Sequence, residues 1–142
     1  AISEQTAYLM INLLKNVVQE GTGIRLRYKY QLMNPIAGKT GTTQNQSDGW
    51  FMGVTPNLVS GAWVGGEDRS IHFNSITYGQ GANMALPIWA LYMQKVYADS
   101  TLAPMVSAED EFEEPNNFDY ILDCEKFEQR NPQQNSRKDD FF

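Results

Sequence analysis

The segment from residue 37 to residue 43, Ala-Gly-Lys-Thr-Gly-Thr-Thr, sets a lysine amine and three hydroxyls beside two glycines. A lysine next to a serine nucleophile supplies positive charge and helps to move protons. A threonine hydroxyl can hold a substrate carboxylate, and a glycine on an edge strand leaves room for a peptide to lie alongside. The next backbone N–H can point at a developing oxyanion. The segment therefore indicates one wall of an acyl-transfer site.

Phosphate-binding P-loops also contain Gly-Lys-Thr, but they need a further glycine five positions before the glycine of that triplet. Here that position is Met33, and Pro35 stands where the loop has to be flexible. A P-loop threonine also opens a helix, whereas residues 41–45, Gly-Thr-Thr-Gln-Asn, are poor helix formers. Both the spacing and the following residues exclude a nucleotide-binding loop.

The surroundings of the Lys-Thr-Gly triplet resemble the C-terminal part of the transpeptidase domain of class A penicillin-binding proteins. The resemblance covers about residues 3–99 and is specific over residues 36–66. The segments that carry it are Gln5–Met10, Val17–Gly23, Gly38–Thr43, Asp48–Gly53, Ala62–Gly66 and Pro87–Trp89. It implies an α+β fold, an incomplete penicillin-binding or β-lactamase-like transpeptidase domain. It also implies a bifunctional parent enzyme, a glycosyltransferase and serine-type D,D-transpeptidase that cross-links peptidoglycan and is inhibited by β-lactams.

By position, the resemblance gives Lys39 the role of the family's third-motif lysine. Thr40 and Thr42 are the implied carboxylate binders, and the Thr42 N–H is one half of the implied oxyanion hole. Gly41 is the implied clearance residue. The resemblance implies no metal and no organic cofactor.

The chain departs from the family pattern in lacking a nucleophile. The residue three positions after each serine is never lysine, and no serine is followed by asparagine two positions on. Those serines are Ser3, Ser47, Ser60, Ser70, Ser75, Ser100, Ser107 and Ser136. We therefore expect this chain alone to be inactive, with the rest of the site in the missing N-terminal part of the same enzyme. The expected ligands of the intact domain are the stem peptide and β-lactams.

Other candidate residues have simpler interpretations. His72 stands alone in a polar loop, which favours a surface histidine over a metal ligand. Cys124 cannot form an internal disulfide, because it is the only cysteine. Trp50, Trp63 and Trp89, with Phe51, are expected to be core residues. The alternating Arg25, Arg27 and Lys29 indicate a solvated strand face, or alternatively a patch for an anionic glycan or lipid.

The elements that must position these residues follow from periodicity. Apolar residues at helical spacing predict a helix over 3–20, ended by Gly21 and Gly23, and a second helix over 83–99. Residues 36–42, 50–55 and 58–65 predict three antiparallel strands, and Gly61 and Gly65 indicate close approach by a neighbouring element. An N-terminal and a C-terminal helix therefore flank at least three strands.

The 142 residues divide by charge near Ser100. Residues 1–100 carry a net charge of +1, and residues 101–142 carry −7, although the whole chain carries only −6. A protein with this balance is not a general nucleic-acid binder. We expect residues 1–100 to be the C-terminal portion of the transpeptidase domain. Residues 101–142 are expected to be an acidic, disordered tail with a short sticky segment at 118–128.

Two further expectations concern partners and location. The alternative function is a non-catalytic folding or interaction module whose acidic tail binds a partner of the parent enzyme. Three strands without the rest of the domain leave an exposed sheet edge, so self-association is expected. The sequence has no membrane span or signal peptide, and the resemblance implies a parent bound to the cytoplasmic membrane with extracytoplasmic, periplasmic catalytic domains.

Overall fold

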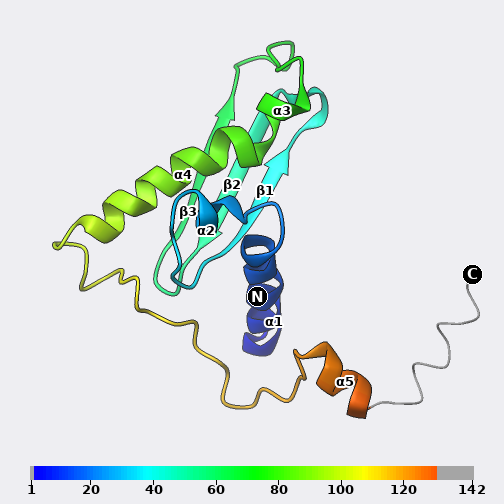
Figure 1. Cartoon of the computed structure of the whole chain (residues 1–142), viewed down its shortest axis with the longest axis vertical. Coiled ribbons are helices and arrows are strands. Elements are labelled where there is room, and N and C mark those ends of the chain that lie inside the picture. Colours follow the sequence, from blue (N-terminus) through cyan, green and yellow to red (C-terminus); the bar gives the residue numbers. More distant parts are fainter. Residues whose placement is uncertain (1, 131–142) are drawn as a thin grey trace, which may run out of the picture.

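The computed structural model describes residues 2–130, in which helices flank a three-stranded antiparallel sheet (Figure 1). This confirms the predicted α+β class. The elements in chain order are α1 Glu4–Gln19, α2 Arg25–Tyr28, β1 Ala37–Thr42, the 3-10 turn η1 Gln44–Gln46, β2 Asp48–Val54, β3 Val59–Gly65, α3 Ile76–Gly79, α4 Gly81–Ala98 and α5 Cys124–Arg130.

The first helix begins and ends where the sequence predicts. Ser3 caps α1 by accepting a hydrogen bond from the Thr6 N–H at 3.2 Å. At the other end, the N–H groups of Gly21 and Gly23 donate to the carbonyls of Asn16 and Val17. A Cβ atom on Gly21 would lie 2.9 Å from Val17 Cα, so this turn is too tight for a larger residue.

The alternating apolar and basic residues after this turn predict a strand, but Arg25–Tyr28 form a helical turn. Leu26 is fully buried, and the Arg27 side chain turns inward rather than into solvent. Its Nη1 donates to the carbonyls of Leu32 at 2.5 Å and Asn34 at 2.7 Å. Burial lowers the pKa of Arg27. The predicted solvated strand face is therefore wrong, since Arg25–Tyr28 are helical and the Arg27 side chain bonds to carbonyls of the loop that follows.

The sheet has the strand order β1-β2-β3, so both outer strands are edges (Figure 1). All three predicted strands are confirmed, with ends shifted by no more than two residues. In the register, Lys39 pairs with Met52 and Gly41 pairs with Trp50, which in turn pairs with Trp63. Their side chains share one face of the sheet.

The opposite face packs against α4. Trp89 of this helix is 1% exposed and meets Phe51 of β2 edge to face at 5.0 Å between ring centroids. The glycines that α4 approaches are Gly49 and Gly53 of β2, not those predicted in β3. Gly61 is crowded instead by the Met52 side chain of the neighbouring strand.

The predicted second helix is confirmed, but it begins at Gly81, so Pro87 lies inside it rather than in the first turn. Its apolar residues surround the helix, yet only one side is buried. Ile88, Leu91 and Tyr92 are each about half exposed on the other side.

Residues 106–122, which we call the strap, contain neither helix nor strand. From Phe112 to Phe118 the strap lies against α1. Asp110 accepts hydrogen bonds from the Asn57 side chain at 2.7 Å and from the Ser107 N–H at 2.9 Å. Further on, the Phe118 ring meets the Tyr8 ring edge to face at 4.8 Å. The strap therefore joins the turn between β2 and β3 to the first helix.

Candidate functional site

The Lys-Thr-Gly triplet lies in β1, at the edge of the sheet and next to α1 (Figure 1). The Lys39 side chain is exposed, and its Nζ donates to the Thr40 carbonyl at 2.8 Å. Because side chains alternate along a strand, Lys39 and Gly41 share one face, and Thr40 and Thr42 share the other. The four predicted site residues thus lie side by side on one accessible strand.

Each threonine hydroxyl in β1 is bonded to a different element. The Thr40 hydroxyl lies 2.8 Å from the Thr22 hydroxyl, in the turn that ends α1. The Thr42 hydroxyl accepts a hydrogen bond of 3.0 Å from the Gly81 N–H, at the first residue of α4. Thr22 and Gly81, which the sequence did not single out, are therefore partners of the site. No local pattern points to these contacts, because Thr22 lies 18 residues from Thr40 and Gly81 lies 39 residues from Thr42.

Gly41 and Gly38 of β1 differ in the space that a side chain would find at each position. A Cβ atom on Gly41 would meet only the Trp50 Cβ, at 3.4 Å, which is ordinary van der Waals contact. On Gly38 it would lie 2.8 Å from the Phe51 ring. An extended peptide that lies against a strand requires open space of this kind.

No described serine hydroxyl bonds to the Lys39 amine. Ser47, the serine nearest to β1 in sequence, is buried, and its hydroxyl bonds to the Thr43 hydroxyl at 2.9 Å. Across residues 2–130, no three His, Cys, Asp or Glu side chains gather as a metal site would require. The exposed His72 ring instead bonds the Phe73 carbonyl at 3.1 Å.

Two of the tryptophans expected in the core lie outside it. Trp50 is 46% exposed and Trp63 is 49% exposed, on the face of the sheet that α4 does not cover. Their ring centroids lie 6.4 Å apart. The prediction was wrong because alternation identifies residues that share a face but not the face that receives a second layer.

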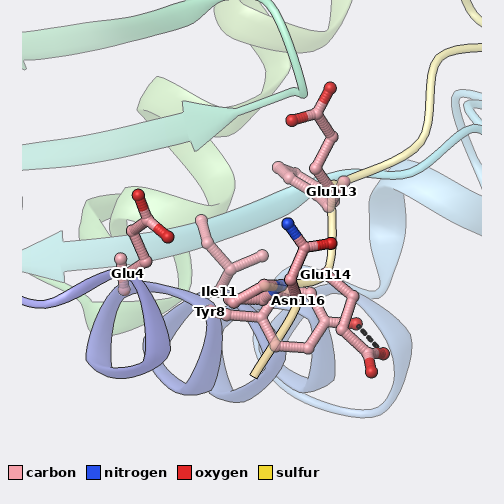
Figure 2. Close-up of a pocket in the computed structure, with 9 residues that line it drawn as sticks. Glu4, Tyr8, Ile11, Glu113, Glu114 and Asn116 are labelled. Carbon is pink, nitrogen blue, oxygen red and sulfur yellow. Dashed lines mark hydrogen bonds between the residues drawn. The ribbon is translucent and has the colours of Figure 1, made fainter. Parts of the chain in front are cut away.

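A cavity of about 760 Å³ lies between α1 and the strap (Figure 2). Tyr8 and Ile11 of α1 face Glu114 and Asn116 of the strap, and the Tyr8 hydroxyl donates to Glu114 at 3.2 Å. None of residues 39–42 lines this cavity. It has no place in the acyl-transfer interpretation.

Known proteins similar to this chain are penicillin-binding proteins, although no protein-family model matches it. Penicillin-binding protein 1A of Pseudomonas aeruginosa is 38% identical over 108 residues, 73% of this chain and 12% of that protein. Penicillin-binding protein 1B of Escherichia coli is 38% identical over 105 residues, 74% of this chain and 11% of that protein. The crystal structure of penicillin-binding protein 1A from Haemophilus influenzae matches with a TM-score of 0.63 and 27% identity, over 82% of this chain and 17% of that one.

The fold is that of a fragment of a penicillin-binding transpeptidase domain. The chain belongs to the class A penicillin-binding proteins, whose 1A and 1B members match about 70% of its length. It spans only about a tenth of the length of these curated relatives. Within residues 2–130, no helix has the combination of length and apolar composition needed to span a bilayer.

Proposed function

We propose that this chain supplies the Lys-Thr-Gly wall of a serine-type D,D-transpeptidase site in a longer enzyme of peptidoglycan synthesis. The observation that carries the proposal is the position of Lys39, Thr40 and Gly41 on an edge strand with open space at Gly41. A stem peptide ending in D-Ala-D-Ala can lie along such an edge. The threonine hydroxyls of β1 would donate to its terminal carboxylate, because a carboxylate only accepts hydrogen bonds.

In the proposed reaction, a serine outside this chain attacks the carbonyl carbon of the penultimate D-Ala. The bond to the terminal D-Ala nitrogen breaks, and D-Ala leaves with the serine proton. An amine on a neighbouring strand then takes the acyl group, and the serine regains a proton. A β-lactam would acylate the same serine by opening its ring amide. Lys39 would supply positive charge near the serine, and the Thr42 N–H would bind the developing oxyanion.

The parent is proposed to be anchored in the cytoplasmic membrane, with these catalytic domains on the periplasmic side and a glycosyltransferase in the same polypeptide. The chain alone is proposed to be inactive, because it lacks a Ser-x-x-Lys sequence. The missing N-terminal part of the enzyme would complete the cleft.

The test is labelling of the intact protein that contains this chain with a fluorescent penicillin. Lys39→Ala is expected to remove most of the acylation, whereas Lys95→Ala, an exposed lysine on α4, keeps it. Full labelling of Lys39→Ala would show that another lysine performs this role. Labelling of the isolated chain would show that the nucleophile lies within it.

A second candidate function is binding of a partner of the parent enzyme by the acidic strap. One observation favours it: Phe112, Pro115 and Phe118 of the strap are half-buried, whereas Glu109 and Glu111 are exposed. The strap would present its carboxylates to a basic protein surface while its apolar side chains hold it on α1. Glu109→Gln combined with Glu111→Gln should weaken co-purification of that partner. Deletion of the strap with binding and activity both unchanged would overturn this proposal.

A further inference from the structure

The hydroxyls of Thr40 and Thr42 lie on the same face of β1, and each is bonded from outside the strand. The bond to Thr42 has a fixed direction. A backbone N–H can only donate, so the Gly81 N–H donates and the Thr42 oxygen accepts. The Thr42 proton is therefore free to be donated to a group beyond the sheet.

Gly81 reaches this position because it has no side chain. A Cβ atom there would lie 2.2 Å from the Gly41 carbonyl oxygen and 2.6 Å from the Trp50 carbonyl oxygen. Both of those atoms belong to the backbone, so the neighbours cannot move aside cheaply. The first residue of α4 therefore contacts β1 at Gly41 and Thr42.

Thr22 holds Thr40 in a comparable way. The two hydroxyl oxygens lie 2.8 Å apart, and either one can donate. Thr22 sits in a turn fixed by the hydrogen bonds of Gly21 and Gly23 to the last turn of α1. A ligand carboxylate next to Thr40 only accepts, so Thr40 then donates to the ligand and Thr22 donates to Thr40. Hydrogen bonds in such a chain strengthen one another.

We propose that Thr22 and Gly81 are positioning residues that make the Thr40 and Thr42 hydroxyls donate together to the carboxylate of the substrate. This inference rests on the proposed transpeptidase function. It assigns the positioning of the carboxylate-binding hydroxyls to two residues outside the Lys-Thr-Gly strand. Thr22 acts from the end of α1 and Gly81 from the start of α4, so helix packing on both sides of β1 sets the direction of the two donors.

The test compares two probes on the intact protein: a penicillin with its free carboxylate, and the methyl ester of the same penicillin. Thr22→Val keeps the shape of the side chain and removes its hydroxyl. We expect it to slow acylation by the free acid about three- to tenfold, the effect of one lost hydrogen bond, and to leave the rate with the ester unchanged. Thr22→Ser should restore the rate with the free acid. Thr77→Val, an exposed threonine on α3, is the matched control.

Equal losses with both probes would show that Thr22 has only a structural role, and no loss with either probe would show that its hydroxyl does not position Thr40. Each of these results overturns the inference. Lys39→Ala in the same assay separates it from the proposed function. If Lys39→Ala retains full acylation, the proposed function fails, whereas a sensitive Lys39 with an insensitive Thr22 overturns the positioning role alone.

Discussion

A Cβ atom on Gly53 would lie 2.1 Å from Cζ2 of Trp89, so β2 and α4 meet at a point where only glycine fits. Gly53→Ala should therefore lower the free energy of unfolding of this chain by about 1–3 kcal/mol, through overpacking of the core. Urea denaturation followed by tryptophan fluorescence measures the change. Gly41→Ala is the matched control, because its Cβ atom would make only ordinary contact. Equal stabilities of the two variants would contradict the close packing at Gly53.

The same Gly41→Ala substitution should separate folding from function in the intact protein. The added methyl group lies where the proposed peptide or β-lactam runs along β1, so acylation by penicillin should fall on the order of tenfold while the fold is kept. Stopped-flow acylation and circular dichroism together test this expectation. Acylation at the wild-type rate would show that no ligand lies against this part of the strand.

Tyr97 should make the stability of the chain depend on alkaline pH. Burial raises the pKa of Tyr97, and the hydrogen bond of 2.5 Å from the Asn34 side chain lowers it to a smaller extent. The pKa of Tyr97 in the folded chain is therefore above its unfolded value of about 10. The contribution of the protonated Tyr97 hydroxyl to the free energy of unfolding is complete below pH 10 and is lost as the pH rises further.

Tyr97→Phe should consequently be less stable than the wild type by about 1 kcal/mol at pH 7, through loss of one hydrogen bond. The difference should shrink above pH 10, since phenylalanine does not ionise. Urea denaturation at both pH values gives the comparison. A difference that stays constant or widens with pH would show that the Tyr97 hydroxyl ionises as easily in the folded chain as in the unfolded one.

The strap should protect α1 from solvent. Phe118→Ala removes the edge-to-face contact with Tyr8, worth about 1 kcal/mol, and should speed hydrogen exchange in α1. Asp119→Asn is the matched control, because this exposed neighbour points to solvent. Hydrogen exchange of α1 identical in both variants would mean that the strap does not rest on the helix in solution.

The uncovered face of the sheet should make the isolated chain associate with a second copy. Trp50, Met52, Val59 and Trp63 expose apolar surface there, and no described residue pairs with the outer edge of β3. Sedimentation velocity should show a mass that rises with concentration, and Trp63→Lys should reduce that rise. A stable monomer at high concentration would contradict this expectation.

Local signals predicted the parts of the fold that are held by local bonds. Ser3 and Gly21 fixed the ends of α1, and the turn before β3 fixed the hairpin. Arg27 was misjudged, since the carbonyls that draw it inward lie in the loop that follows. The roles of Thr22 and Gly81 depend on contacts with β1, many residues away in sequence, and no local pattern encodes them.

The docking of the strap also affects how this domain should be trimmed for crystallography or inhibitor screening. A cut at the change of charge near Ser100 would keep the whole Lys-Thr-Gly strand but would strip the aromatic cover from Tyr8. Helix α1, which would then be exposed, ends at the turn that contains Thr22. Expression boundaries set beyond Tyr120 would preserve that cover.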